Sequence, residues 1–262
     1  MSFTLATWNI NSVRLREGLV QRLMREDAPD VLCLQEIKTP VELMPREGFA
    51  ELGYHHVVAR GQKGYNGVAI LSKLPLEEVH ARDFADLGHA RHVSARLPNG
   101  VIVHNFYVPA GGDIPDRDRN IKFGQKLDYL TQMRDWWHEI SPERSIMVGD
   151  LNIAPREDDV WNHKSLLKIV SHTPIEVEHL AQVQDAGNWV DITRQDIPSG
   201  RLYSWWSYRS PDWNAADKGR RLDHVWATRD IAAAGHSSRI LRDVRGWEQP
   251  SDHVPVLATF DL

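Results

Sequence analysis

Short apolar segments typical of β-strands recur along this chain, and only a few helical segments lie between them. We expect strands over residues 3–8, 29–35, 67–72, 91–97, 101–108, 144–149, 189–192, 202–208, 221–227, 236–241 and 254–260, with a hairpin turn at 98–100. Apolar residues at helical spacing predict helices over 15–26, 122–138 and 175–185, the last preceded by an N-cap at Thr173 and opened by Pro174. So many strands with helices at intervals predict an α/β sandwich of two packed sheets flanked by helices, and not a doubly wound parallel sheet.

We expect neither an internal division nor a targeting segment in this chain. No stretch rich in Gly, Pro or Ser interrupts it, so we expect residues 1–262 to form a single domain. The only cysteine, Cys33, lies in an apolar run, which fits a core residue in a reducing, cytoplasmic location. No apolar run approaches the roughly 18 residues of a membrane helix, and we expect no signal peptide.

The charge balance is acidic, with 31 Lys plus Arg against 36 Asp plus Glu and a net charge of −5. This balance is not typical of a protein that coats DNA. It does not exclude an enzyme that acts on DNA, because a local basic face suffices and several acids can serve as metal ligands.

Polar side chains gather where the expected strands begin or end. Six clusters contain Asn9 and Asn11, Gln35 and Glu36, Asn105 and Tyr107, Asp150 and Asn152, Asp223, and Ser251 with Asp252 and His253. One such residue alone is most often a cap or a turn residue. Together at one edge of the sandwich, the carboxylates among them would repel one another in a partly dry cleft, which implies a bound cation. Oxygen-rich ligands with few His and no Cys favour Mg²⁺ or Mn²⁺ over Zn²⁺.

Seven of the chain's segments resemble a known motif set. They are WNIN at 8–11, LQEIK at 34–38, NFYVP at 105–109, GDLNI at 149–153, YSWWSYR at 203–209, RLD at 221–223 and SDHVP at 251–255. In this order they resemble the exonuclease III family of AP endonucleases, within the endonuclease/exonuclease/phosphatase superfamily, over residues 4–260. The resemblance implies one catalytic domain with a four-layered α/β sandwich, in which two mixed β-sheets pack face to face between helices and the site lies at one sheet edge.

The implied activity is that of a Mg²⁺-dependent DNA repair phosphodiesterase, in which Mn²⁺ can substitute. Such an enzyme cuts double-stranded DNA 5′ to abasic sites and has 3′→5′ exonuclease and 3′-phosphatase or 3′-repair diesterase activity; we expect a monomer. The alternatives are a 3′-end-processing phosphatase and exonuclease without AP endonuclease activity, or a small-molecule phosphoesterase of the same superfamily. A non-catalytic DNA-binding relative would have lost Glu36, Asp150, Asn152 or His253, and the chain keeps all of these.

The resemblance also implies roles for individual residues. Glu36 would be the main metal ligand, and Asp150 the general base, with Tyr107 as the alternative. His253, oriented by Asp223, would donate to a phosphate oxygen. The implied metal-site residues are Asn9, Glu36, Asp150, Asn152, Asp252 and His253, and the implied catalytic residues are Tyr107, Asp150, Asn152, Asp223 and His253.

DNA contacts are expected around this site. The implied DNA-binding residues are Asn11, Lys38, Arg117, Trp205, Arg220 and Leu222, and Trp205 with Leu222 would line a pocket for a flipped-out abasic sugar. Further phosphate contacts are expected from Lys218, Arg221, Arg119, Lys122 and Lys126. The chain departs from the family pattern at Asn11, where relatives often carry Asp, at Ala110, where they often carry an amide, and at Arg220, where they carry an apolar or aromatic residue.

Overall fold

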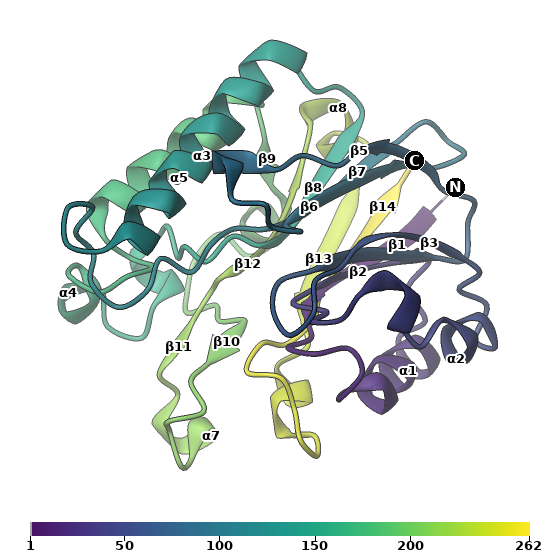
Figure 1. Cartoon of the computed structure of the whole chain (residues 1–262), viewed down its shortest axis with the longest axis horizontal. Coiled ribbons are helices and arrows are strands. Elements are labelled where there is room, and N and C mark those ends of the chain that lie inside the picture. The colour runs from purple at the N-terminus through teal and green to yellow at the C-terminus, as the bar shows by residue number, and fades with distance from the viewer. Residues whose placement is uncertain (1) are drawn as a thin grey trace.

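The structure, a computed structural model, describes residues 2–262 and contains two mixed six-stranded β-sheets (Figure 1). The first sheet has the order β13 (His236–Ile240), β14 (Val256–Asp261), β1 (Ser2–Asn9), β2 (Val31–Gln35), β4 (Val68–Ser72) and β3 (His56–Arg60). The second has the order β5 (Glu77–His80), β6 (His92–Arg96), β7 (Ile102–Tyr107), β8 (Ser145–Asp150), β12 (Asp223–Ala227) and β9 (Val190–Asp191). A separate ribbon pairs β10 (Trp205–Trp206) with β11 (Gly219–Arg220).

Helices cover the outer faces of both sheets, which makes the four layers of the predicted α/β sandwich (Figure 1). α1 (Glu17–Glu26) and α2 (Arg46–Ala50) lie on the first sheet, and α3 (Ile121–Ile140) and α5 (Pro174–Ala186) on the second. The connections contain α4 (His163–Leu166), α6 (Ile192–Asp196), α7 (Trp213–Ala216), α8 (Arg229–Ala232) and the 3-10 turns Val41–Leu43, Phe84–Asp86, Glu157–Asp159 and Arg242–Gly246. None of the helices within residues 2–262 is long and apolar enough to cross a membrane.

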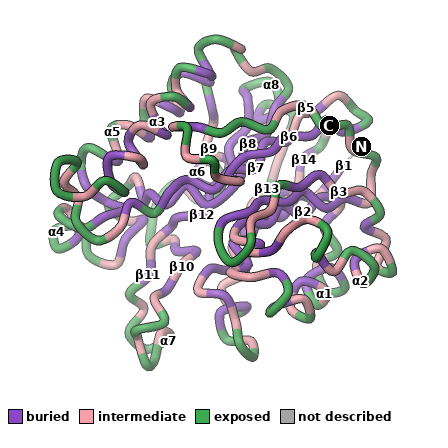
Figure 2. Tube along the Cα trace, in the orientation of Figure 1, coloured by how far each residue is buried: buried purple, intermediate pink, exposed green. Residues whose placement is uncertain are grey.

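The strands build the core through the alternation of their side chains, and Figure 2 shows both sheets as largely buried. On β1, Leu5 faces the core between the sheets and Trp8 faces the helical side. On β8, Val148 lies between the sheets and Met147 packs in the core with α3. Because the side-chain period of a strand is two, the polar residue that ends each of these strands falls on the inner face. Cys33 is fully buried between the sheets, as predicted.

The directions of the central strands bring these polar ends to one edge. β1 runs parallel to β2, and β7 runs parallel to β8, so each pair ends at the same edge of its sheet. β12 runs antiparallel to β8 and begins at that edge, with Asp223 opposite Asp150. The site is therefore assembled from both sheets.

Most predicted elements agree with the structure in type, but two predicted strands are much shorter. Of residues 202–208 only Trp205–Trp206 forms a strand, because Ser204 N donates to Arg220 O while Trp206 N donates to Asp252 O, on a different segment. The strand expected over 189–192 stops at Asp191, whose side chain accepts from Arg194 N and caps α6.

Two edge strands were missed, and the start of one helix was predicted wrongly. β3 and β5 were not predicted, because they are edge strands that carry charged residues instead of a clean apolar pattern. The first helix begins at Glu17, and Leu15 is 63% exposed instead of lying on its buried face.

Buried histidines under α3 make the stability of the fold depend on pH. His104 of β7 and His92 of β6 stack with ring centroids 5.7 Å apart, and the His104 ring meets Trp136 edge-on. Burial, with a contribution from His80, lowers the pKa of His104 to about 3. His104 is therefore neutral in the fold, whereas in the unfolded chain it takes up a proton below about pH 6.5. Its neutral-state stabilisation is complete above that pH and is lost as the pH falls from about 6.5 towards 3.

We expect His104→Phe, which keeps a ring but removes the titration, to flatten this loss. In urea unfolding between pH 6.5 and 4, the slope of unfolding free energy against pH should fall by up to about 1.4 kcal/mol per pH unit. His138→Gln, at the exposed end of α3, is the matched control and should leave the slope at the wild-type value. A wild-type slope in His104→Phe would contradict this account of the histidine stack.

Candidate active site

The backbone turns sharply at polar residues that directly follow the strands. Glu36 and Lys38 after β2, and Asn152 after β8, have positive φ angles of 50°, 53° and 53°. Gly149, with φ 141°, approaches β7 so closely that an added Cβ would lie 1.9 Å from Phe106 O, and only glycine fits there. This close approach places Asp150 directly beside Tyr107 in the strand register.

Asn9 joins the two sheets at the centre of the site. Its fully buried side chain donates from Nδ2 to Glu36 Oε1 at 3.0 Å and to Asp150 Oδ2 at 2.8 Å. Tyr107 donates its hydroxyl to the same Glu36 oxygen at 2.7 Å. Asn152 donates its backbone N–H to Asp150 Oδ1 at 2.9 Å and its Nδ2 to Asp150 Oδ2 at 3.2 Å. Asn9 thus donates to both carboxylates, while Tyr107 donates to Glu36 and Asn152 donates to Asp150.

A line of polar contacts runs from Glu36 to the aromatic residue Trp205. Lys38 Nζ lies 2.7 Å from Glu36 Oε2 and donates to Asn11 Oδ1 at 2.6 Å. Asn11 Nδ2 donates to Asp252 Oδ1 at 3.2 Å, and Trp205 Nε1 donates to Asp252 Oδ2 at 2.9 Å. The ammonium of Lys38 therefore lies between a carboxylate oxygen and an amide oxygen of this group.

A second set of contacts orients His253. Its Nδ1 lies 2.8 Å from Asp223 Oδ2, and its Nε2 lies 3.6 Å from Asp150 Oδ2. Ser204 Oγ donates to the same Asp223 oxygen at 2.6 Å. The other oxygen, Asp223 Oδ1, is buried with no hydrogen-bond partner in residues 2–262. Ligand atoms of Asp150, Asp223 and His253 lie within 4.8 Å of one another, so these residues form one compact acid–base cluster.

Burial and charge shift the ionisation of these groups in different directions. Burial raises the pKa of Asp150 to about 7, with repulsion from Asp223 added and attraction to His253 opposing it. Burial opposes protonation of His253, but the charges of Asp223 and Asp150 outweigh it and raise the pKa of His253 to about 10. Burial and the nearby carboxylates Glu36 and Asp150 raise the pKa of Tyr107 well above its usual range. Burial also disfavours the Glu36 carboxylate, yet Lys38 and the donors around it lower the pKa of Glu36.

We expect Ser204→Ala to destabilise the protein through this network. Ser204 Oγ accepts the backbone N–H groups of Leu222 and Asp223, each at 3.0 Å, besides donating to the Asp223 carboxylate. Its loss leaves buried polar groups unsatisfied, which costs about 1–3 kcal/mol. Urea unfolding measures the loss, with half-buried Ser207→Ala as the matched control in the same segment. An unchanged unfolding free energy in Ser204→Ala would show that the contact does not support Asp223.

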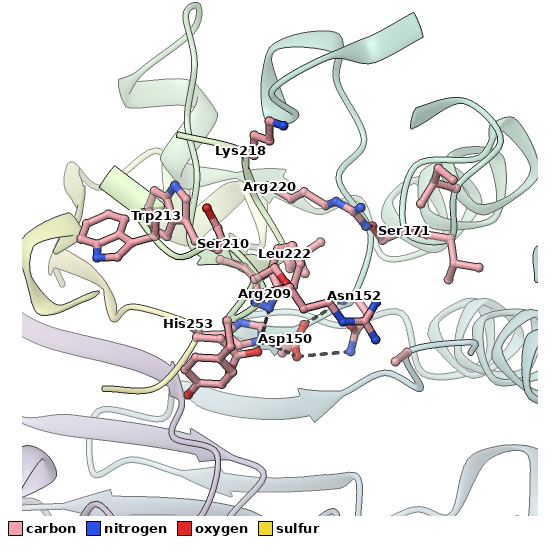
Figure 3. Close-up of a pocket in the computed structure, with 18 of the residues that line it drawn as sticks. Asp150, Asn152, Ser171, Arg209, Ser210, Trp213, Lys218, Arg220, Leu222 and His253 are labelled. Carbon is pink, nitrogen blue, oxygen red and sulfur yellow. Dashed lines mark hydrogen bonds and ion pairs between the residues drawn. The ribbon is translucent and has the colours of Figure 1, made fainter. Parts of the chain in front are cut away.

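One pocket of about 960 Å³ is lined by Asp150 and His253 of this cluster and by an adjoining wall (Figure 3). Its polar lining includes Glu36, Tyr107, Asp150, Asn152, Asp252 and His253. Its apolar lining includes Trp161, Ile169, Val170, Trp205 and Leu222, and its basic lining consists of Arg209, Lys218 and Arg220. The pocket therefore joins charged groups to a mostly apolar wall with local positive charge.

The structure brings together all the predicted site residues except one. Asn9, Asn11, Lys38 and Asp223 do not line the pocket themselves but bond to residues that do. Arg117 lies outside this set, because its Nη2 pairs with Asp128 Oδ1 of α3 at 2.8 Å and it does not line the pocket.

Two basic residues that were expected to contact DNA are fully buried, so that expectation is wrong. Lys126 Nζ pairs with Glu176 Oε1 at 2.5 Å and donates to Asn152 O at 2.8 Å. Arg221 Nε pairs with Asp159 Oδ1 at 2.7 Å. Both side chains hold segments around the site in place. Ser204 and Arg209 were not predicted as site residues, although both lie within the segment YSWWSYR.

A four-layered sandwich with acids, amides and a His–Asp pair at the shared edge of its sheets has the architecture of a metal-dependent phosphoesterase. The sequence profile of the endonuclease/exonuclease/phosphatase family matches residues 6–253. The chain is 30% identical to exodeoxyribonuclease III of Haemophilus influenzae over 97% of its own length and 98% of that protein.

Solved structures give the same result. The chain resembles an AP endonuclease from Archaeoglobus fulgidus with a TM-score of 0.92 and 32% identity, over 99% of this chain and 100% of that one. It resembles the 3′ phosphatase NExo from Neisseria, bound to product DNA hairpin, with a TM-score of 0.91 and 31% identity over the same shares. The chain belongs to the endonuclease/exonuclease/phosphatase family, in its exodeoxyribonuclease III branch.

Proposed function

We propose that this protein is a Mg²⁺-dependent DNA repair nuclease that nicks double-stranded DNA 5′ to abasic sites and processes 3′ ends as an exonuclease and 3′-phosphatase or 3′-repair diesterase. The observation that carries the proposal is the position of Asp150. Its buried carboxylate faces donors from both sheets and the His253 ring, in a pocket with an apolar wall. Similarity to exodeoxyribonuclease III and to an AP endonuclease over nearly the whole chain supports the same activity.

The donor set of the site fits a hard divalent cation. Glu36, Asp150 and Asp252 offer carboxylate oxygens, Asn152 offers an amide oxygen, and the described lining of the pocket contains no cysteine. We propose that Glu36 and Asp252 hold Mg²⁺, with Mn²⁺ able to replace it. When bound, the cation supplies positive charge that neutralises the scissile phosphate and the leaving oxygen.

Four predicted metal-site residues have other roles in this proposal. Asp150 and Asn152 serve the general-base step of the proposed reaction. Asn9 turns its amide nitrogen to Glu36 and Asp150 and its oxygen to Asn11 N, so we assign it to fixing the two carboxylates. The two ring nitrogens of His253 face the carboxylates of Asp223 and Asp150, so neither nitrogen is directed at a metal. We therefore assign His253 to contacting the phosphate.

In the proposed reaction, Asp150 is the general base. Its carboxylate takes a proton from a water molecule while the water oxygen attacks phosphorus and the P–O3′ bond breaks; the leaving 3′ oxygen takes a proton from solvent to give the 3′-hydroxyl. The burial that raises the pKa of Asp150 makes its ionised form a stronger base. Asn152 orients this carboxylate, and His253 donates from Nε2 to a phosphate oxygen while Asp223 holds Nδ1. The nearby carboxylates keep Tyr107 neutral, which favours Asp150 over Tyr107 as the base.

The products are a 3′-hydroxyl end and a 5′-phosphate that carries the abasic sugar. We propose that this sugar lies against Trp205 and Leu222, because both line the pocket that contains the acid–base cluster. A sugar without its base costs less to extrude from the duplex than an intact nucleotide does.

A cleavage assay with Mg²⁺ tests the proposal. It uses three labelled duplexes, with one abasic site, with a recessed 3′ end, and with a 3′-phosphate. A nick 5′ to the abasic site that EDTA abolishes is the expected result. Removal of the 3′-phosphate alone would replace the proposal with a 3′-end-processing enzyme, and no cleavage of the three duplexes would refute it.

We infer that residues 1–262 act as a single catalytic domain and as a monomer, because both sheets contribute to the site and one chain supplies all its described groups. Turnover per chain should then be independent of protein concentration. A rise of specific activity with concentration would indicate a required oligomer.

A further inference from the structure

Arg220 places a positive charge in the wall of the pocket, and Trp205 links it to the residues next to the acid–base cluster. It lies opposite Trp205 in the β10–β11 ribbon, and its guanidinium carbon is 5.2 Å from the centre of the Trp205 ring. The Trp205 indole in turn donates to Asp252, the neighbour of His253. Figure 3 shows Arg220 on the pocket wall together with Leu222 and His253.

The contacts of Arg220 hold its guanidinium in place but leave its charge unpaired. Nη1 donates to Val170 O at 2.9 Å and to Ser171 Oγ at 2.7 Å, both of which are neutral acceptors. Glu176, the acid whose charge acts on Arg220, forms its ion pair with Lys126. Arg220 Nε is buried with no hydrogen-bond partner in the described part of the chain. An anchored cation without an acidic partner in a pocket wall is suited to an anionic ligand.

The proposed substrates differ in the group that they present to this wall. When DNA is cut 5′ to an abasic site, the P–O3′ bond breaks and the 5′ oxygen of the phosphate carries the sugar into the pocket. In a terminal 3′-phosphate the same bond breaks, but that oxygen is free and charged. A phosphomonoester carries about 1.5 to 2 negative charges at neutral pH, against one for a diester. A cation in the wall therefore stabilises the monoester more than the abasic sugar.

Building on the proposed function, we propose that Arg220 is a specificity-determining residue that shifts this site towards 3′-phosphomonoester ends and away from abasic sugars. A neutral sugar seated against Arg220 would desolvate the guanidinium without offering it a negative charge, which is unfavourable. The terminal phosphate offers that charge. Trp205 and Leu222 provide the rest of the wall for both substrates.

The test measures kcat/KM on two duplexes that differ at one position, a 3′-phosphate at a single-nucleotide gap and an internal tetrahydrofuran abasic site. Arg220→Gln keeps a donor for the Val170 carbonyl but removes the charge, and Arg220→Lys keeps the charge. Arg220→Gln should lower the ratio of 3′-phosphate to abasic-site kcat/KM by about tenfold or more, the contribution of a hydrogen bond to a charged group. Arg220→Lys should keep a ratio close to the wild-type value.

The possible outcomes separate this proposal from the function on which it rests. An equal loss of kcat/KM on both duplexes, or an unchanged ratio, overturns the role of Arg220 and leaves the nuclease function intact. A wild-type protein that cuts neither duplex overturns the proposed function, and the specificity role with it. Should Arg220→Gln fail to fold, Arg220→Leu, of the residue type that relatives carry at this position, takes its place with the same expected fall in ratio.

Discussion

Asp150→Asn is expected to reduce kcat on an abasic-site duplex by about 10²–10⁴-fold, the contribution of a general base. Asparagine has nearly the shape of aspartate but cannot accept the proton of the attacking water. The surrounding donors, Asn9 and Asn152, hold the carboxylate in place, and Tyr107 stays neutral and cannot replace it. Single-turnover cleavage with Mg²⁺ measures the loss, and circular dichroism with thermal unfolding should show a fold close to that of the wild type.

Asp113→Asn is the matched control for this experiment. Asp113 is an exposed acid that lines the same pocket, so Asp113→Asn makes the same substitution there without touching the proposed base. The control should cleave at close to the wild-type rate. Wild-type turnover in Asp150→Asn would show that Asp150 is not the base. Tyr107 would then be tested with the variant Tyr107→Phe.

Glu36→Gln is expected to lower activity by about 100-fold or more at low Mg²⁺ and to recover part of it at high Mg²⁺. The Glu36 carboxylate follows β2 of the first sheet and lies in the site, and neutralising it removes several kcal/mol of attraction for a divalent cation. Glutamine still accepts from Asn9 and Tyr107, so the local structure should persist. Titration of activity with Mg²⁺ and Mn²⁺ measures the shift of the activation midpoint to higher concentration.

Glu42→Gln is the control for this titration, because Glu42 is an exposed acid of a nearby 3-10 turn. Its activation midpoint should equal that of the wild type. If Glu36→Gln were activated at the same metal concentration as the wild type, the cation would be held elsewhere and the assignment of Glu36 would be wrong.

The edge on which the site lies can be predicted from the sequence because it follows from strand periodicity. On β1 and β8, the terminal residues Asn9 and Asp150 follow the inner-facing Leu5 and Val148 at even spacing. The alternation therefore assigns the polar residues to the inner face before any contact is known. The parallel pairing of the strands then brings them to one edge.

The pocket wall and its supports cannot be predicted in this way, because their partners come from distant segments. From the sequence alone, Lys126 is interpreted as a surface lysine on a helix, whereas in the structure it pairs with Glu176 of α5. Arg221 is likewise interpreted as part of a basic run, whereas in the structure it is buried in an ion pair with Asp159. The segment around Trp205 reads as a strand, although its backbone bonds to Arg220 on one side and to Asp252 on the other. Local patterns report neither the pairing nor the burial of such residues.

A water molecule activated in this site is proposed to break the P–O3′ bond. Cleavage of an abasic-site duplex in water enriched in oxygen-18 tests this step most directly, when fragment mass spectrometry locates the heavy oxygen in both products. We expect one heavy oxygen in the 5′-phosphate of the abasic fragment, none in the 3′-hydroxyl of the upstream fragment, and no products when EDTA removes the metal. An unsaturated aldehyde on the 3′ end, with no heavy oxygen in the phosphate groups of either fragment, would mean that the strand opens by elimination at the sugar and that no water attacks phosphorus.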